Sequence, residues 1–211
     1  MKGIGPWSKA AVAQSSELIN SRVWLDGPYG RLSIDPAQYS HCVFVVGGIG
    51  VTPFLSLMEE LLALPKERQP HIEFIWTMRE LALLQHFESK LNRFAELGAN
   101  VSYHVTSTSK DRGGSVDTGS FELVSQLEHS ESAMNLVPTK SKARPNLAAI
   151  FTRVADHYGI NHNTHYNAER TGCALLCCGP PALVSAVQHA AGLVSMISQM
   201  PIDIHQEVFE F

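Results

Sequence analysis

The strongest constraint on the fold is a short apolar run followed at once by a glycine-rich turn and a helical pattern. Residues 41–46 read HCVFVV, which is too short for a helix and typical of a strand buried on both faces of a sheet. A glycine-rich turn covers 47–53, and apolar residues then recur at helical spacing over 54–64, before Pro65. The sequence therefore predicts a strand, a glycine turn and a helix, in that order.

The same unit repeats along the chain, with buried strands alternating with helices. This alternation predicts an α/β fold with a doubly wound parallel sheet. Residues 107–142 are polar and rich in Ser and Gly, and they are expected to form a long mobile excursion, with one helix near 121–127. Further strands are expected at 22–25, 72–77, 101–106, 173–178 and 202–211, and further helices at 81–97, 147–158 and 181–197, the last broken at Gly192.

Composition excludes several classes of partner. A formal net charge of −4 over 211 residues gives no basic field for nucleic acid or for an anionic membrane surface. No stretch approaches the roughly 18 consecutive apolar residues that a membrane helix needs, so the chain as given is expected to be soluble. None of the four cysteines lies in a CxxC pair, which favours reduced, buried thiols: Cys42, Cys173, Cys177 and Cys178.

The first candidate site is the glycine turn itself. Gly48, Gly50 and Pro53 form a GxGxxP pattern between the strand and the helix. Such a turn lets backbone N–H groups approach an anion at the positive end of the helix, as in a pyrophosphate site. The alternative is a tight turn that only packs the first helix, because many unrelated turns match so short a pattern.

The second candidate site is Cys178-Gly179-Pro180-Pro181, at the carboxyl end of a buried strand and directly before a helix. Ligands of open α/β sheets lie along that edge, and a small, polarisable thiol there suits contact with a flat ring. Either turn alone could be structural. Both turns in one chain, each at a strand end, predict a ligand crevice between them.

Four motifs in a fixed order carry a family resemblance. Residues 26–30 read DGPYG, 47–54 GGIGVTPF, 178–181 CGPP and 205–211 HQEVFEF. This order resembles the carboxy-terminal half of the ferric reductase and NADPH oxidase family, in the ferredoxin-NADP reductase-like superfamily. Residues 2–8 are similar to the family segment that contains the last strands of a flavin-binding β-barrel. The resemblance implies a remnant of the FAD-binding barrel at 1–30 and an NAD(P)H-binding domain at 31–211.

The resemblance also implies an electron relay. NADPH gives a hydride to FAD, and the flavin passes electrons to haems in the membrane, which reduce ferric iron or dioxygen. The expected partners are the FAD-binding and haem-containing transmembrane domains of a parent protein, with possible cytosolic regulators, at the cytosolic face of a membrane. The family's Arg-x-Tyr-Ser/Thr flavin motif does not occur in this sequence, so FAD is expected to be held mainly by another domain.

Site residues follow from the matched motifs. Gly48 and Gly50 are expected to face the pyrophosphate and Thr52 the nicotinamide side of the crevice. Cys178 is expected near the ring carbon that carries the hydride, acting by position rather than by acid/base chemistry. Phe211 resembles a terminal aromatic that stacks on the flavin, although a core position on an edge strand is an equal alternative. The full expected cofactor contact set is Gly47, Gly48, Ile49, Gly50, Val51, Thr52, Pro53, Arg79, Arg144, Cys178, Gly179, Pro180 and Pro181.

Preference for NADPH over NADH depends on Arg79, which follows the second strand where NAD-selective folds place an acidic residue. A guanidinium fork there suits a phosphate, and Arg144 resembles a family position that adds a second contact. Glu80 follows Arg79 and opposes this preference. The alternative for Arg79 is a solvent-exposed arginine at a helix start.

Two other functions stay open at this point. One is a soluble flavoprotein reductase of the ferredoxin-reductase type, and the other is a dinucleotide-sensing module without turnover. Hydrolase and phosphotransferase functions have no GxSxG or P-loop motif to support them. His157, His162 and His165 are interpreted as solvated histidines of a polar loop, so no metal site is predicted.

Overall fold

The computed structural model describes residues 6–14, 16, 22, 24, 32–79, 81–106, 139–141, 144–163 and 172–207. The chain divides into two units, Met1–Leu32 with Phe209–Phe211 and Ser33–Val208. In the described part of the first unit, Pro6–Ala13 forms helix α1, which the sequence pattern did not predict. The strand expected at 22–25 is described only at Arg22 and Trp24, and neither residue is in a strand. A barrel remnant at 1–30 therefore stays a prediction.

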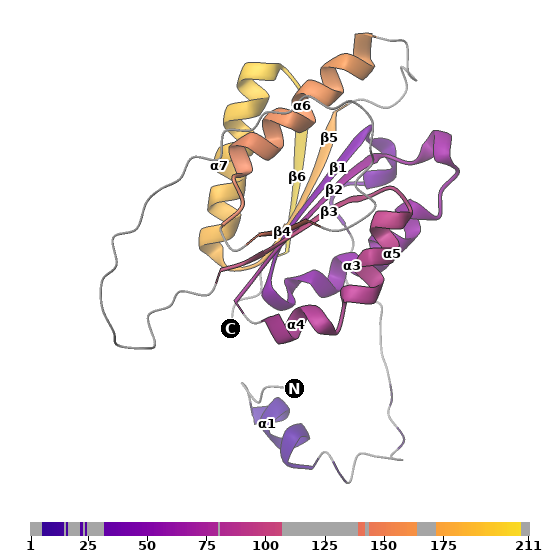
Figure 1. Cartoon of the computed structure of the whole chain (residues 1–211). Coiled ribbons are helices and arrows are strands. Elements are labelled where there is room, and N and C mark those ends of the chain that lie inside the picture. The colour runs from indigo at the N-terminus through magenta and orange to yellow at the C-terminus, as the bar shows by residue number, and fades with distance from the viewer. Residues whose placement is uncertain are drawn as a thin grey trace. The chain divides into compact units, whose positions relative to one another are not determined.

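The second unit contains a six-stranded parallel sheet, as predicted from the alternation of strands and helices. Its order is β4-β3-β2-β1-β5-β6, so β1 lies near the centre (Figure 1). β1 and β5 are buried along their whole length because helices cover both faces of the sheet. The strands are β1 (His41–Gly47), β2 (His71–Met78), β3 (Asn100–Val105), β4 (Thr139–Ser141), β5 (Cys173–Cys178) and β6 (Ile202–Glu207).

Helices lie on both faces of the sheet (Figure 1). One face carries α3 (Thr52–Leu62), α4 (Leu81–Gln85) and α5 (Glu88–Glu96), and the other carries α6 (Leu147–Asn163) and α7 (Pro181–Ser198). On the α3 face, the Phe44 ring centroid lies 5.7 Å from that of Phe54 and 5.9 Å from that of Phe74. On the α6 and α7 face, the core includes Val43, Val45, Phe151, Val154, Leu175, Val184, Val187 and Val194. Complete burial of each such side chain stabilises the fold by about 1.5–3 kcal/mol.

The expected helix at 81–97 is two helices, so this prediction is wrong in detail. The chain turns at Phe87, whose φ of −120° and ψ of −4° are not helical. The Phe87 ring packs edge-on against Trp76 of β2, with centroids 5.9 Å apart. We infer that this aromatic contact favours the turn over continuous helix, because it brings the ring onto the sheet.

Helix α7 also differs from the expectation, since it continues through Gly192 without a break. Gly192 is exposed, and a glycine in a helix interior costs only about 1 kcal/mol relative to alanine. Burial of Val187, Ala191 and Val194 on the same helix outweighs that cost.

Strands β4 and β6 each lie next to residues outside the described ranges. The short edge strand β4 lies inside the polar 107–142 segment, where only a helix was expected. The expected helix at 121–127 lies outside the described residues. β6 is described to Glu207, so the end of the predicted strand at 202–211 lies outside them too.

Helix α7 is long and apolar enough to cross a membrane by length and composition, with a mean hydropathy of 1.3. This helix is not a run of about 18 consecutive apolar residues, because Ser, Gln and His interrupt it. The inward face of α7 packs into the core on one face of the sheet, through residues such as Val184 and Val187. A helix that covers a sheet packs in this way, and such a helix can be as long and as apolar as one that crosses a membrane.

Candidate functional site

The candidate site lies where the strand order reverses. From β1 the chain builds β2, β3 and β4 on one side, and then returns to place β5 and β6 on the other. The glycine turn follows the carboxyl end of β1, and the CGPP turn follows the carboxyl end of β5. These two strands are neighbours, with Val46 paired to Cys178. Ligands of doubly wound sheets bind in the crevice at this switch point.

The two turns are in direct contact, and glycine makes this contact possible. A Cβ atom at Gly50 would lie 2.8 Å from Cys178 Sγ and 2.9 Å from the Cys178 carbonyl oxygen. A Cβ atom at Gly179 would lie 3.2 Å from both Cα and N of Gly47. Side chains at these positions would push the two turns apart, because one obstacle in each case is backbone. The structure thus brings together the two motifs that the sequence placed far apart.

The shape of the glycine turn is set by its neighbours. Gly48 has a φ of +54°, in the left-handed region, and a Cβ there would face open space. Gly48–Val51 forms a single 3₁₀ turn, and α3 begins directly after it at Thr52. The Thr52 hydroxyl donates to the Ile49 carbonyl over 3.0 Å, which closes the turn onto the helix.

Trp76 is a site residue that the sequence analysis missed. Its indole Nε1 donates to the Gly48 carbonyl oxygen over 2.8 Å, so β2 fixes the glycine turn from the side opposite to β5. The position of Trp76 follows from the strand register, in which Trp76 pairs with Val46, the residue just before the turn. A sequence pattern alone does not give this register.

Exposure separates the residues that a ligand can reach from those that support them. Ile49, Thr52, Pro53, Pro180 and Pro181 are exposed, and Gly48 is partly exposed. Gly50, Val51 and Cys178 are buried. The accessible surface is therefore the backbone and short side chains of the two turns, and the Cys178 thiol lies beneath it against Gly50.

The Cys178 thiol is protonated near neutral pH. Burial raises the pKa of Cys178 to about 11, and the negative charge of Glu207 adds to the effect. The thiol is therefore neutral at pH 7, which agrees with an effect through position rather than through ionisation.

We expect Cys178 to react slowly with thiol reagents in the folded chain. Because the pKa is about 11, the thiolate fraction near neutral pH is about 100-fold below that of a free cysteine. Timed alkylation followed by peptide mass spectrometry measures this directly, with the denatured chain as the control in which all four cysteines react. Labelling of Cys178 in the folded chain at the rate of free cysteine would contradict the burial described above.

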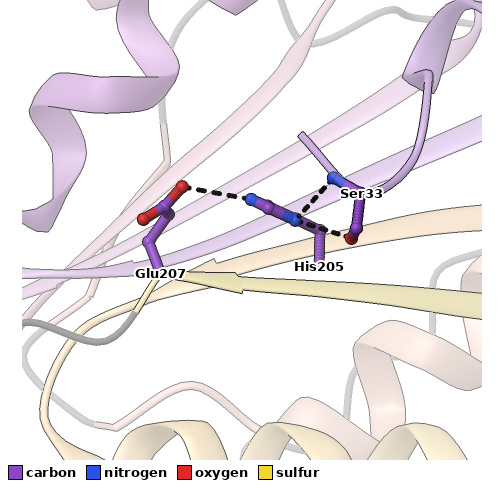
Figure 2. Close-up of polar contacts among 3 residues, drawn as sticks. All are labelled: Ser33, His205 and Glu207. Atoms are coloured by element: carbon purple, nitrogen blue, oxygen red, sulfur yellow. Dashed lines mark hydrogen bonds and ion pairs between the residues drawn. The ribbon is translucent and has the colours of Figure 1, made fainter. Parts of the chain in front are cut away.

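A chain of hydrogen bonds flanks the site on β6 (Figure 2). The Ser33 N–H donates to His205 Nδ1 over 3.2 Å, so Nε2 carries the imidazole proton and donates to Glu207 Oε1, also over 3.2 Å. The Ser33 hydroxyl lies 2.8 Å from His205 Nδ1. Glu207 is paired in register with Cys178. This network joins Ser33, which precedes β1, to β6, beside the CGPP turn.

The remaining predicted residues are spread along the same edge of the sheet. Arg79 follows the end of β2, next to the glycine turn, and its side chain is exposed. Arg144 follows β4 at the edge of the sheet, so β3 separates its strand from that of Arg79. Arg144 is exposed too, two residues before Asn146, whose Oδ1 accepts from the Ala149 N–H at the start of α6. Phe211 lies outside the described residues.

Comparisons with known proteins identify the family of this chain. The family profile described as "Ferric reductase NAD binding domain" matches residues 39–192. Respiratory burst oxidase homolog protein B of Arabidopsis thaliana is 26% identical over 89% of this chain and 24% of its own length. Human NADPH oxidase 3 is 28% identical over 87% of this chain and 32% of its own length. Ferric reduction oxidase 8, mitochondrial, of Arabidopsis thaliana is 29% identical over 61% of this chain and 19% of its own length.

The chain therefore spans about a quarter of the first of these relatives. The family profile covers most of the parallel sheet, from just before β1 to within α7, including both turns of the candidate site. The relatives are named as oxidases and as a ferric reduction oxidase, which makes the family one of oxidoreductases. This chain belongs to the ferric reductase NAD-binding domain family.

Proposed function

We propose that this chain binds NADPH across the carboxyl ends of β1 and β5 and presents its hydride to FAD. The observation that carries the proposal is the direct contact between the glycine turn and the CGPP turn at the point where the strand order reverses. That contact builds one continuous surface from two loops. Its open part is the backbone at Gly48, ahead of α3, where N–H groups and the positive helix end suit a pyrophosphate.

The choice of NADPH is supported by Arg79. Its guanidinium is exposed beside the glycine turn, at the end of the strand where the ribose of a dinucleotide lies in folds of this class. A guanidinium donates two parallel hydrogen bonds to a phosphate, whereas a ribose hydroxyl offers it no charge to pair with. The human relative is itself named an NADPH oxidase.

Replacement of Arg79 by alanine is expected to remove the preference for the phosphorylated cofactor. Loss of one charge-assisted contact should weaken NADP⁺ binding by about tenfold to a hundredfold, with little effect on NAD⁺. Calorimetric titration of the whole chain with each nucleotide measures both affinities. Arg93→Ala is the matched control, because Arg93 is an exposed arginine in the last turn of α5, at the opposite edge of the sheet.

Two results of that titration would count against the proposal. If Arg79→Ala and Arg93→Ala lower NADP⁺ affinity equally, Arg79 does not contact the 2′-phosphate. If neither nucleotide binds the chain, the same titration of a protein extended through the flavin domain decides the matter, and absence of binding there too overturns the dinucleotide site.

The rest of the proposed relay lies outside this chain. The expected FAD contacts belong to a flavin domain, and onward transfer to haem and then to ferric iron or dioxygen belongs to transmembrane domains of a parent protein. The proposed location of this domain is the cytosolic face of that membrane. Both oxidases and a ferric reduction oxidase are among the relatives, so the proposal includes both acceptors. Alone, the chain should bind the dinucleotide without turnover.

A further inference from the structure

Three histidines meet at the edge of the sheet opposite to the dinucleotide crevice. His41 is the first residue of β1 and His71 the first of β2, and the strand register pairs them. His157 comes from α6, and its ring packs edge-on against that of His41. The interpretation of His157 and His162 as residues of a polar loop is therefore wrong, because helix α6 continues through both positions to Asn163. His165 lies outside the described residues.

The three imidazole rings lie close enough together for one nitrogen of each to reach a common ion. His41 Nε2 lies 2.9 Å from His157 Nδ1, and the ring centroids of His71 and His157 are 4.2 Å apart. One nitrogen from each residue falls in a group whose members all lie within 4.8 Å of one another. Zn–N bonds of about 2.0–2.1 Å in a tetrahedral site set N···N separations of about 3.4 Å, so small ring movements bring all three onto one ion.

His71 provides an independent indication of a ligand. Its Nδ1 atom is buried and has no hydrogen-bond partner in the part of the chain that the structure describes. A buried polar atom without a partner costs about 1–3 kcal/mol, and such atoms are rare in folded proteins. A cation bound at Nδ1 would satisfy this nitrogen.

His41 is held in the form that ligates a metal. The Ser40 hydroxyl donates to the Gly172 carbonyl over 2.9 Å, so its oxygen accepts from His41 Nδ1–H, 3.0 Å away. The lone pair of His41 is then on Nε2, which faces His157. Metal-bound histidines commonly donate their other ring N–H in this way, which fixes the orientation of the ring.

We propose that His41, His71 and His157 form a binding site for a divalent transition metal, most simply Zn²⁺ held by three imidazoles and one water. His71 and His157 are only partly buried, which leaves a path for the ion and for the water. Such a site would tie helix α6 to the amino ends of β1 and β2. Because it lies at the opposite edge from the two turns, it is independent of the proposed dinucleotide site.

The charges around the site are compatible with a cation. Arg153 on α6 repels a cation, but its guanidinium is paired with the Glu73 carboxylate over 3.1 Å. Glu73 is itself buried, so the pair adds little net charge beside the histidines.

The test uses the whole chain, free of affinity tags and stripped with a chelator. Calorimetric titration with Zn²⁺ near neutral pH should give one ion per chain and raise the unfolding temperature. Titration with Co²⁺ should give the visible absorption of a tetrahedral site without a thiolate-to-cobalt band, which excludes the cysteines as ligands.

Two variants and a control make the result specific. Loss of an outer-shell partner alone costs about 10–100-fold in metal affinity, so His157→Gln or His71→Gln should cost about 100-fold or more. His189→Gln is the control, because it removes an exposed histidine of α7 and should leave zinc affinity unchanged. The circular dichroism of each variant without metal confirms that it is folded. The proposal is overturned if the wild-type chain takes up no zinc, or if both folded variants bind zinc as the wild type does.

Discussion

Gly50→Ala should weaken NADP⁺ binding by about tenfold or more and lower the free energy of unfolding by about 1–3 kcal/mol. The added methyl would lie 2.8 Å from Cys178 Sγ and 2.9 Å from the Cys178 carbonyl oxygen. The carbonyl belongs to a buried strand and cannot move aside, so the glycine turn must shift away from β5. The backbone N–H groups proposed to hold the pyrophosphate shift with it. Calorimetric titration and denaturant unfolding measure the two effects.

Gly192→Ala is the matched control for this variant. It adds the same methyl group at an exposed position of α7, where a Cβ would have no atom within 4 Å. It should stabilise the chain by about 0.5–1 kcal/mol through helix propensity and leave NADP⁺ affinity unchanged. Normal binding and stability of Gly50→Ala would show that the contact between the two turns does not shape the site.

A double variant separates the two obstacles at Gly50. Cys178→Ala removes the sulfur but leaves the carbonyl oxygen at 2.9 Å from the added methyl. We therefore expect Gly50→Ala with Cys178→Ala to recover only part of the lost affinity. Complete recovery would mean that the thiol alone limits residue 50.

Acid should destabilise this chain strongly in the absence of metal. The pKa of His41 is lowered from 6.5 to about 3, by burial and then by neighbouring His71 and His157. The pKa of His71 is lowered from 6.5 to about 4, by burial and then by neighbouring His157 and Arg153. Between the unfolded pKa of 6.5 and the folded pKa values, the unfolded chain binds more protons than the folded chain. The contribution of these histidines to stability is therefore complete above pH 6.5 and is lost as the pH falls toward about 4. Each histidine contributes about 1.4 kcal/mol per pH unit, on the order of 5 kcal/mol for the pair over two units. That loss rivals the total stability of an ordinary domain.

Denaturant unfolding across this pH range, with a chelator present, measures the slope. His71→Phe should reduce it by about 1.4 kcal/mol per pH unit, because one of the two depressed groups is gone. An unchanged slope in His71→Phe would show that His71 is protonated as readily in the folded chain as in the unfolded one.

Local sequence pattern predicted the sheet and both site turns. HCVFVV and CALLCC are buried strands, and the motifs that follow them meet at the switch point as expected. These predictions succeed because a short run buried on both faces fixes the strand, and a glycine turn at its end fixes the edge where a ligand lies.

The features that local sequence pattern did not predict depend on strand register and on packing between distant segments. The bond from Trp76 to the Gly48 carbonyl follows from the pairing of β2 with β1, which no local pattern specifies. The histidine cluster joins two strands to a helix far along the chain. The turn at Phe87 follows from an aromatic contact with the sheet, whereas the helical spacing of apolar residues over 81–97 predicted one helix.

The pairing of β1 with both β2 and β5 has a consequence for synthesis on the ribosome. A nascent chain that ends before Cys173 already contains β1, β2, β3 and the glycine turn, but it has no strand to cover the open edge of β1. Contacts of such long sequence separation form late and slowly. The proposed dinucleotide site is incomplete until β5 and α7 have emerged, so the exposed edge of β1 is the segment for which a chaperone would compete during translation.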